Sequence, residues 1–396
     1  MILSGGAGRG RKPFPKSIRI SDFGAAPPMD THWVLLDGSR LVVESCVRAG
    51  ANVYVGYPIT PASLIFSYAS RRFPIALPAP DEITALQWMA GLSAAGYLPV
   101  TATSFPGFAL MVESINMAYM MELPMLIILV QRLGPSTGTA TAGAQGDLLL
   151  LDGLISGGYP LPVLCISDLK DCWLLPPVAL RAAVEMRTPV VLLSSKEMVM
   201  TQASFDLSQL SEIEPVRQAF YHGPGPYRPY DPGDGLVPPF LHVGSDHDVV
   251  RLNASTHDRS GLLQHTSGEA MANTRRLGEK VEALTPVLYH LDEQEGARTL
   301  VVSYDITSGA AREAVKMLRA QGVPVSLLLA RTLLPVPAIY YEVIDRYSRV
   351  VIAEENAQGQ FARLLFGRRI PPNIRLVGAV GRMVRPEEIA REVLAP

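Results

Sequence analysis

The chain has 396 residues, of which 48% are hydrophobic and 18% charged, with a formal net charge of -2 at pH 7. This length exceeds what one hydrophobic core usually serves, so we expect two domains and a connector. The balanced charge argues against a nucleic-acid partner, which would need a basic surface. The mean hydropathy is positive, which predicts apolar surface covered by other subunits.

The first 28 residues are expected to form a flexible extension. They place basic residues among Gly and Pro with no apolar stretch behind them, unlike a secretory signal. The longest apolar runs are broken by charged residues or Pro and fall short of the roughly 20 residues that cross a bilayer. Cys46, Cys165 and Cys172 have the spacing of neither a disulfide framework nor a metal or cluster site. We therefore expect a cytoplasmic protein with no membrane span and no metal ligands of its own.

Residues 29–200 show the pattern of a parallel-sheet α/β domain, in which short β-rich runs alternate with helical stretches. Strands are expected at 53–55, 100–103, 126–130, 163–166 and 190–193, and helices at 64–72, 82–95, 109–121 and 177–185. The helix at 82–95 is rich in Ala, Gly and Ser. Small residues let another backbone approach closely, so this helix is expected to be buried.

Residues 201–296 have the composition of a connector. Six prolines crowd the stretch from Pro224 to Pro239, and a charged helix is expected at 269–284. Residues 297–396 predict a second, compact α/β domain. Its strands are expected at 300–302, 325–329 and 350–354, and its helices at 310–320 and 338–346.

Four stretches are longer than chance motifs. The first is Gly56-Tyr57-Pro58-Ile59-Thr60-Pro61-Ala62-Ser63, before a helix that Thr60 or Ser63 could cap. The second is Asp81-Glu82-Ile83 with Thr103-Ser104-Phe105-Pro106-Gly107-Phe108 beyond it. The third starts at Gln131-Arg132-Leu133-Gly134 and ends at Gln145-Gly146-Asp147-Leu148. The fourth, in the connector, includes Tyr227-Arg228-Pro229-Tyr230 and Thr256-His257-Asp258.

With these stretches the sequence resembles the alpha subunit of 2-oxoacid:ferredoxin oxidoreductases, from about Leu36 to the C-terminus. The resemblance implies a pyrimidine-type thiamine diphosphate-binding domain and a smaller α/β domain of transketolase C-terminal type. It also implies a cofactor shared with a beta subunit that holds the diphosphate, Mg²⁺ and a [4Fe-4S] cluster. Gamma or delta subunits, ferredoxin, coenzyme A and a 2-oxoacid are the other implied partners. We expect this chain to carry no diphosphate and Mg²⁺ site of its own, which agrees with that division.

Glu82 matches the family's catalytic carboxylate. Thiamine chemistry needs a carboxyl group that shares a proton with the aminopyrimidine, and burial would raise its pKa for that purpose. The alternative is that Asp81 and Glu82 only complement a helix N-terminus.

Thr60 and Arg132 are implied at the 2-oxoacid, where a hydroxyl and a planar cation suit a carboxylate. Their alternatives are a helix cap and a surface ion-pair partner. The resemblance further implies cofactor contacts from Tyr57, Pro58, Ile59, Glu82 and Phe108.

The glycine-rich stretch 134–146 lacks the Gly-x-x-x-x-Gly-Lys-Ser/Thr pattern of a phosphate-binding loop. We expect it to close over the cofactor or to pack on the beta subunit. His257 and Asp258 have no paired ligand spacing and are interpreted as structural.

The sequence departs from the family in several charged positions. Ala142 and Ala144 stand where Lys and Glu are usual, and Ser156-Gly157-Gly158 replaces a His-Gly-Glu segment. Because the distal carboxylate of 2-oxoglutarate needs a cation, an apolar or aromatic 2-oxoacid is expected instead.

The leading hypothesis is an enzyme subunit for oxidative decarboxylation of a 2-oxoacid to acyl-CoA, or the reverse carboxylation, with electrons passing through iron–sulfur clusters to ferredoxin. Two alternatives stay open at this point. One is a catalytically degenerate scaffold subunit of such a complex. The other is a cluster-free thiamine diphosphate dehydrogenase or transketolase-type subunit.

Overall fold

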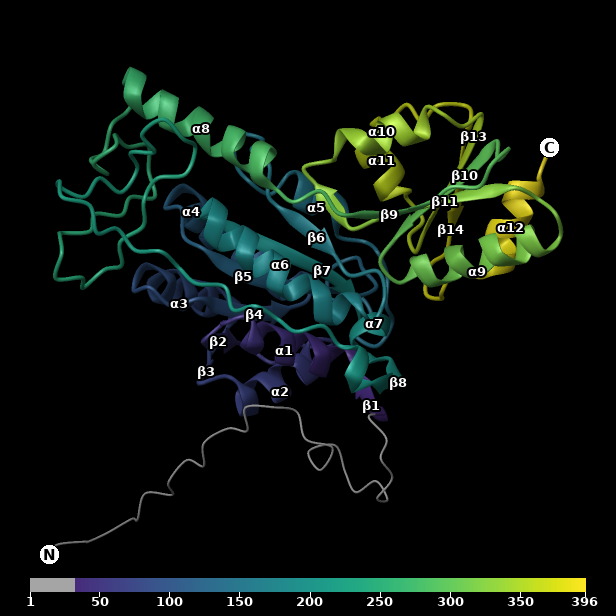
Figure 1. The fold of residues 1–396 in the computed structure, drawn as a ribbon, viewed down its shortest axis with the longest axis horizontal. Helices are drawn as coiled ribbons and strands as arrows, with labels where there is room; N and C mark the ends of the chain where they lie inside the picture. Colours follow the sequence, from purple (N-terminus) through teal and green to yellow (C-terminus); the bar gives the residue numbers. More distant parts are fainter. Residues whose placement is uncertain (1–32) are drawn as a thin grey trace, which may run out of the picture.

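A seven-stranded sheet forms the first domain of the computed structural model, which describes residues 33–396 (Figure 1). The strand order is β12-β6-β7-β5-β4-β2-β3, and only the β12–β6 pair is antiparallel. The strands are β2 (Val53–Gly56), β3 (Ile75–Pro78), β4 (Pro99–Thr103), β5 (Met125–Gln131), β6 (Val163–Cys165), β7 (Pro189–Ser195) and β12 (Thr332–Leu334).

Helices cover both faces of this sheet, which is why its strands are apolar throughout. Along β5, Leu126, Ile128 and Val130 pack in one core with α1, α2 and α6, while Ile127 and Leu129 pack in the other with α3 and α4. This alternation follows from the two-residue period of a strand. The helices are α1 (Gly38–Arg48), α2 (Ser63–Arg72), α3 (Glu82–Ala94), α4 (Phe105–Met120), α5 (Leu148–Asp152), α6 (Asp171–Met186) and α7 (Lys196–Met200).

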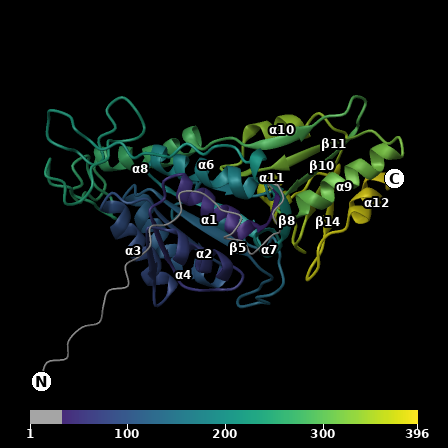
Figure 2. The same cartoon turned by 60° about the horizontal axis from the view of Figure 1, so that its bottom comes forward.

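The second domain is a five-stranded sheet in the order β14-β13-β10-β11-β9, in which β9 alone is antiparallel. Helices α9 and α12 pack together on one face (Figure 2). The other face carries α10 and α11 and shares one core with the first domain. The elements are β9 (Tyr289–Asp292), β10 (Thr299–Tyr304), α9 (Thr307–Ala320), β11 (Val325–Ala330), α10 (Ala338–Ile344), β13 (Arg349–Glu354), α11 (Gln360–Phe366), β14 (Ile374–Gly378) and α12 (Pro386–Leu394).

In the sequence, a turn-rich connector separates the two domains and ends in α8 (Gly268–Leu284). It leaves the first domain through β8 (Gln202–Asp206), which pairs with β1 (Trp33–Asp37), and the short η2 helix (Leu207–Gln209). In Figure 1 the green coil of the connector and α8 lie at the end of the molecule opposite the second domain.

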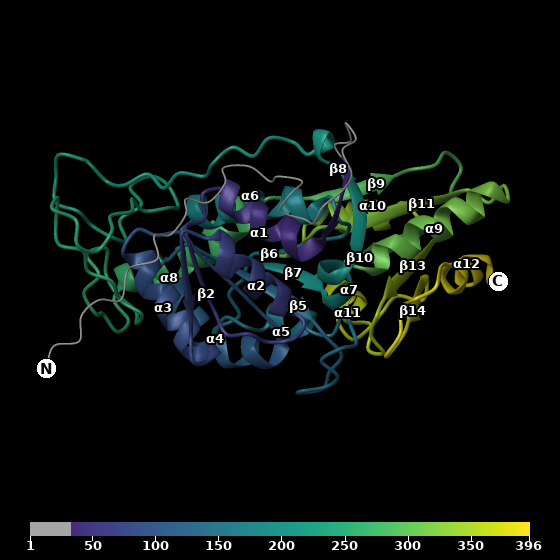
Figure 3. The ribbon, with the colours of Figure 1, turned by 90° about the horizontal axis from the view of Figure 1, so that it is seen from below.

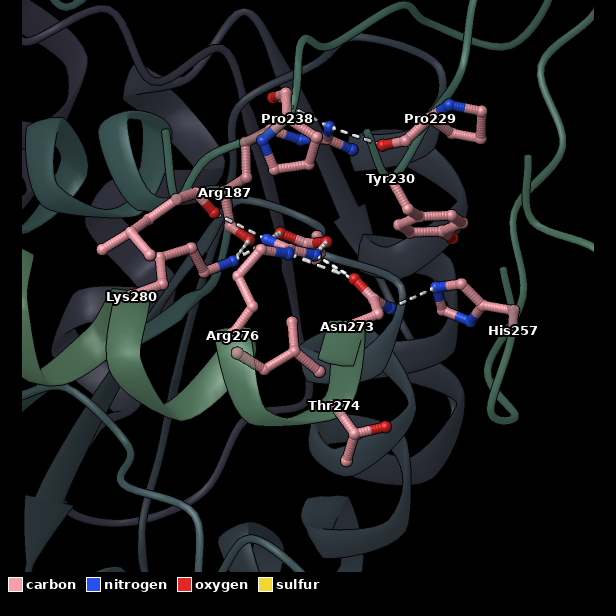
Figure 4. Close-up of polar contacts among 12 residues, drawn as sticks. Arg187, Pro229, Tyr230, Pro238, His257, Asn273, Thr274, Arg276 and Lys280 are labelled. Atoms are coloured by element: carbon pink, nitrogen blue, oxygen red, sulfur yellow. Dashed lines mark hydrogen bonds and ion pairs between the residues drawn. The ribbon is translucent and has the colours of Figure 1, made fainter. Parts of the chain in front are cut away.

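A buried ion cluster holds the connector on the first domain. Glu122, at the turn between α4 and β5, accepts hydrogen bonds from Arg276 and Lys280 of α8, at 3.1 Å from Arg276 Nη1 and 2.6 Å from Lys280 Nζ. Arg187 Nη1 donates to the carbonyl oxygens of Pro229, at 3.1 Å, and Pro238, at 3.2 Å. We call Glu122, Arg187, Arg276 and Lys280 the connector clamp; in Figure 4 the side chains of Arg276 and Lys280 approach each other, while that of Arg187 points toward Pro229 and Pro238.

His257 extends the same network as a structural residue. Its Nδ1 lies 2.6 Å from the Ser255 carbonyl oxygen, and its Nε2 lies 3.0 Å from Asn273 Nδ2 (Figure 4). Since a carbonyl oxygen can only accept, Nδ1 carries the proton and Nε2 accepts from the amide. Both ring nitrogens are therefore used within the fold, and burial lowers the pKa of His257.

The predicted α/β fold class is confirmed, and most predicted elements coincide with observed ones. Three details were wrong. The helix expected at 177–185 begins at Asp171 and contains Pro176 and Pro177, and the helix expected at 109–121 begins at Phe105. Neither Thr60 nor Ser63 caps α2, because Ala62 occupies its N-cap position without a side-chain bond.

The predicted extension at 1–28 lies outside the described residues. The domain boundaries at 200 and 296 remain a prediction. β9 of the second sheet lies before residue 297, and β12, after it, joins the first sheet. Among residues 33–396, no helix is both long and apolar enough to cross a membrane.

Candidate active site

Three of the four predicted motifs, the second of them through two segments, lie at one edge of the sheet because each segment follows the carboxyl end of a neighbouring parallel strand. In the sheet the strands stand in the order β5-β4-β2-β3. Arg132 follows β5, Gly107 follows β4, Thr60 follows β2 and Glu82 follows β3. Carboxyl ends of parallel strands share one edge of the sheet, where α/β proteins commonly bind ligands.

Glu82 is a buried carboxylate at the first position of α3, with only 6% of its surface exposed. Asp81 is the N-cap and accepts the 2.7 Å hydrogen bond from Thr84 N, so the capping role does not fall to Glu82. Among residues 33–396, no basic side chain forms an ion pair with Glu82. Burial raises its pKa, and the charge of Asp81 adds to the effect. The structure thus gives the N-cap role to Asp81, while Glu82 lies in the first turn of α3 with its side chain buried.

Gly107 makes room for this carboxyl group. A Cβ atom placed on Gly107 would lie 2.4 Å from Glu82 Oε1 and 2.4 Å from Thr103 Oγ1. Any larger residue at position 107 would therefore displace the Glu82 side chain. Gly107 stood in a predicted motif, but its role became visible only once β3 and β4 were placed in space.

Thr60 and Arg132 are in direct contact. Arg132 Nη1 donates to the Thr60 carbonyl oxygen at 2.6 Å, across β4 from one strand end to another. Arg132 is 5% exposed and forms no ion pair with the described residues, so it is not a surface ion-pair partner. Its Nε is buried with no hydrogen-bond partner in residues 33–396. The Thr60 side chain is exposed, with its hydroxyl 3.4 Å from Ser63 Oγ.

The remaining predicted cofactor contacts divide into two groups. Tyr57 and Pro58 are exposed and Ile59 is half-buried, all in the turn that leads from β2 to Thr60. Phe108 is fully buried in the core next to Gly107. The first group offers a surface to a ligand, whereas Phe108 supports the wall behind it.

A second polar group, which sequence reasoning missed, lies where the two sheets point their carboxyl ends at each other. Gln131 Nε2 donates to Asp305 Oδ2 at 3.1 Å, and Gln131 Oε1 accepts from Asp147 N at 3.2 Å. Gln145 N donates to the Glu355 carbonyl oxygen at 2.9 Å. We call Gln131, Gln145, Asp147, Asp305 and Glu355 the junction cluster. No sequence period announces such a cluster, because it depends on the docking of two domains.

The acids of the junction cluster have raised pKa values. Burial raises the pKa of Asp147 to about 7, although the charge of Arg132 opposes the shift. Burial also raises the pKa of Glu355 to about 7, and Glu197 adds to it. The pKa of Asp305 is raised well above its ordinary range by burial and by Glu355. Asp147 and Glu355 are therefore about half protonated near pH 7 and mostly protonated below it.

The residues at the strand ends fit an aminopyrimidine and a 2-oxoacid. Glu82 presents a carboxyl group of raised pKa that no cation neutralises, as sharing a proton requires. The unpartnered Nε–H of Arg132 is a donor for a carboxylate. Within residues 33–396, no group of three or more His, Cys, Asp or Glu could hold a metal ion, and all three cysteines are buried and free.

Residues 44–282 match a family model described as pyruvate flavodoxin/ferredoxin oxidoreductase, thiamine diphosphate-binding. The chain is 30% identical to the 2-oxoglutarate synthase subunit KorA of Archaeoglobus fulgidus, over 91% of this chain and 98% of the relative. It is also 30% identical to the ketoisovalerate oxidoreductase subunit VorB of Methanothermobacter thermautotrophicus, over 88% of this chain and 92% of the relative.

Among solved structures, the 2-oxoglutarate:ferredoxin oxidoreductase of Magnetococcus marinus, with 2-oxoglutarate, coenzyme A and succinyl-CoA bound, superposes with a TM-score of 0.86. It is 27% identical, and the match covers 93% of this chain and 66% of that chain. A split-gene transketolase, an inactive beta4 tetramer, matches with a TM-score of 0.50 at 16% identity, which relates the fold alone; the match covers 90% of this chain and 95% of that chain.

Proposed function

The chain belongs to the pyruvate flavodoxin/ferredoxin oxidoreductase family as the alpha subunit of a 2-oxoacid:ferredoxin oxidoreductase, and we propose how its own residues serve that reaction. The family forms acyl-CoA from a 2-oxoacid and passes the electrons to ferredoxin. When bound, thiamine diphosphate supplies the electron sink that lets the carboxyl group of the 2-oxoacid leave. The observation that carries the proposal is the buried, cation-free Glu82 at the shared edge of the sheet.

Glu82 holds a proton at the aminopyrimidine. Its raised pKa favours the protonated form, so the carboxyl group can hold a proton and exchange it with the ring, which is what general acid–base catalysis needs. Gly107 keeps the space that this side chain occupies, since a Cβ there would meet its Oε1. Tyr57, Pro58 and Ile59 would form the exposed side of the pyrimidine site, with Phe108 behind it.

Arg132 and Thr60 bind and orient the 2-oxoacid. The free Nε–H of Arg132 is positioned to donate to the substrate carboxylate, and its Nη1 bond to Thr60 fixes the guanidinium plane. The exposed Thr60 hydroxyl offers a second donor nearby. Binding the carboxylate in a fixed direction limits the orientations that the reacting carbons can take.

A beta subunit would complete the site from the solvent side. The helices that flank Glu82 expose large apolar side chains, namely Ile83 and Trp88 on α3 and Leu110 on α4. Such side chains favour burial against another protein chain. The diphosphate, Mg²⁺ and [4Fe-4S] sites would lie on that partner, and gamma or delta subunits could join the assembly. We place the complex in the cytoplasm, where the three free cysteines would stay reduced.

The substrate is proposed to be a 2-oxoacid with an uncharged, apolar side chain. From Leu133 to Leu169 the sequence contains no Lys, Arg or His, so Arg132 is the last cation before Lys170. A second carboxylate on the substrate would find no positive partner in this segment. KorA of Archaeoglobus fulgidus and VorB of Methanothermobacter thermautotrophicus, named for different 2-oxoacids, are each 30% identical to this chain, so percentage identity does not choose between their substrates.

The role of Glu82 is tested by Glu82→Gln in the assembled complex. We expect 2-oxoacid-dependent reduction of a viologen dye to fall at least about 100-fold, the usual scale of acid–base help. Glu113→Gln is the matched control, since Glu113 is exposed on α4. Thiamine diphosphate should remain bound in both variants. If the Glu82 variant keeps activity within a few-fold of the parent, the assignment is wrong.

The substrate class is tested by comparing 2-oxoisovalerate with 2-oxoglutarate in the same complex. We expect kcat/KM to favour 2-oxoisovalerate by at least about 10-fold, which corresponds to one unfavourable buried charge of roughly 1.4 kcal/mol. A preference for 2-oxoglutarate would contradict the proposal.

A further inference from the structure

The loop of residues 133–146 starts directly after Arg132 and returns to the sheet edge before α5. In Figure 3 the blue-teal loop after β5 projects from the body of the molecule. The residues from Gly134 to Thr139 are exposed and carry no charge. Because the loop begins at the residue after Arg132, a shift of its backbone would change the position of Arg132.

The loop has a fixed internal geometry. Leu133 N donates to the Ala142 carbonyl oxygen at 2.8 Å, and Thr139 N donates to the Leu133 carbonyl oxygen at 3.0 Å. Gly138 has a φ of +53°, and a Cβ there would lie 1.6 Å from the Leu133 carbonyl oxygen. Gly143 N donates to Glu197 Oε1 at 3.0 Å. The loop is therefore held in one conformation by its own hydrogen bonds and by the bond to Glu197 of α7.

The second domain grips the end of this loop through Gln145, which is fully buried. Gln145 Nε2 donates to the Tyr304 carbonyl oxygen at 2.8 Å, and its Oε1 accepts from Thr307 Oγ1 at 2.6 Å. The same Oε1 accepts from Glu355 N, and the Gln145 carbonyl oxygen accepts from Asn356 Nδ2 at 2.9 Å. All four partners lie in the second domain, so one side chain and its backbone anchor the loop there.

The start of the loop is also tied to the second domain. Gln131, the residue before Arg132, donates to Asp305 Oδ2 at 3.1 Å. Arg132 thus stands between two anchors, Gln131 and Gln145, and its own guanidinium has one hydrogen bond, to Thr60. The direction of Arg132 consequently depends on backbone that the second domain holds in place.

We propose that Gln145 is a positioning residue, through which the second domain holds the 133–146 loop and aims Arg132 at the 2-oxoacid. The inference rests on the proposed role of Arg132 and adds a function for the second domain in substrate binding. A purely structural role for Gln145 would lower stability without changing substrate affinity selectively.

The test replaces Gln145 by Met in the assembled complex; Met has similar length but lacks the three side-chain hydrogen bonds, to Tyr304, Thr307 and Glu355. We expect the KM for the 2-oxoacid to rise at least about 10-fold, with kcat within about 3-fold of the parent, because substrate binding is weakened before the reaction step. Arg331→Met is the matched control. It breaks another contact between the domains, the 2.9 Å bond from Arg331 Nε to Asp171 Oδ2, away from the loop. Equal rises of KM in both variants, or none in Gln145→Met, would overturn the proposal.

Amide hydrogen exchange of the full chain gives a second readout that does not need activity. The Leu133, Thr139 and Gly143 amides should exchange at least about 10-fold faster in Gln145→Met and at the parent rate in Arg331→Met. If Gln145→Met does not assemble, Thr307→Val removes only the 2.6 Å bond to Gln145 Oε1 and should raise the same exchange rates less. If the parent complex has no 2-oxoacid activity, the proposed function is wrong. If the loop amides of Gln145→Met exchange at the parent rate, only this inference is wrong.

Discussion

In the connector clamp one buried carboxylate, Glu122, forms ion pairs with Arg276 and Lys280 and is stabilised by the charge of Arg187, whereas in the junction cluster three buried acids lie among neutral amides. Opposite charges hold the pKa of Glu122 down at about 2, even though burial alone would raise it. In the junction cluster burial prevails, so the pKa values of Asp147 and Glu355 rise to about 7. The same kind of side chain is thus charged near neutral pH at the connector and protonatable at the junction between the two sheets.

The difference separates two ways of joining parts of a chain. The Glu122 carboxylate stays charged over the physiological pH range. Removing one partner of such a buried ion pair lowers the stability strongly, because the other charge is left buried and unpaired. Amides and protonated acids make the joint depend on pH, because each carboxyl group that ionises there faces a poorly compensated charge. The charge of Glu122 that holds the connector therefore does not change near neutral pH, whereas the contacts that hold the second domain change in strength with pH.

The largest effect is expected from Glu122→Gln in the clamp. The variant leaves Arg276 and Lys280 buried without their anion, which should lower the free energy of unfolding by about 3–5 kcal/mol. Denaturant titration of the complex followed by circular dichroism measures it. Glu279→Gln, at an exposed position of α8, is the control and should change little. A loss below about 1 kcal/mol would mean that the clamp is not a charge-based joint.

A smaller effect of opposite sign is expected from Glu355→Gln in the junction cluster. The folded-state pKa of Glu355, about 7, exceeds its ordinary value of 4.5, so the folded protein binds the extra proton and loses stability as the pH rises from about 4 to about 7. The neutral amide removes this penalty and can still accept from Val384 N, at 3.2 Å in the parent. We expect the variant to be more stable than the parent at pH 8, by up to about 3 kcal/mol, and equal to it at pH 4.

The measurement is a series of unfolding curves from pH 4 to pH 8. Glu122 sharpens the contrast, because its contribution is present above pH 4.5 and is lost only as the pH falls toward its folded-state pKa of about 2. Burial lowers the pKa of Lys280 to about 8 even with Glu122 present, so the variant without that anion should lose most stability near pH 5 and less toward pH 8. Identical slopes in the parent and in Glu355→Gln would contradict the assignment to the junction cluster.

The smallest effect is expected from Ser267→Ala at the N-terminus of α8. Ser267 Oγ accepts from Ala270 N at 3.2 Å, and losing such a cap costs about 1 kcal/mol. Because α8 carries Arg276 and Lys280, the comparison with Glu122→Gln tells whether the helix or its charges hold the connector. Thermal unfolding measures both variants, and Ser267→Gly should recover most of the loss. If Ser267→Ala and Glu122→Gln lower the stability equally, the helix rather than its charges holds the connector in place.

Local pattern was enough to predict most of the fold. Apolar runs such as 126–130 gave the central strands, because a strand covered by helices on both faces is apolar throughout. Helix α6 was predicted too short, since Pro177 resembled a first helical residue, whereas the helix accommodates Pro176 and Pro177 after its first turn. β3 was missed because its four residues are only half-buried or exposed.

The candidate site was predictable to the extent that it lies in contiguous motifs. Glu82, Thr60 and Arg132 each follow a strand and carry chemistry that the motif context specifies. The junction cluster was not predictable, because Gln131 and Asp305 are separated by 174 positions and meet only when two sheets dock end to end. Neutral amides such as Gln145 also leave no charge pattern in the sequence.

Strand β12 has a consequence for how the protein is made. Residues 332–334 pair with β6, so the first sheet receives its last strand from a segment that lies inside the second domain. During synthesis from the N-terminus, β6 remains an open edge until residue 334 has left the ribosome, and open edges recruit foreign strands. A truncated chain that stops at the connector would keep that edge permanently, so the two domains cannot be exchanged as independent modules.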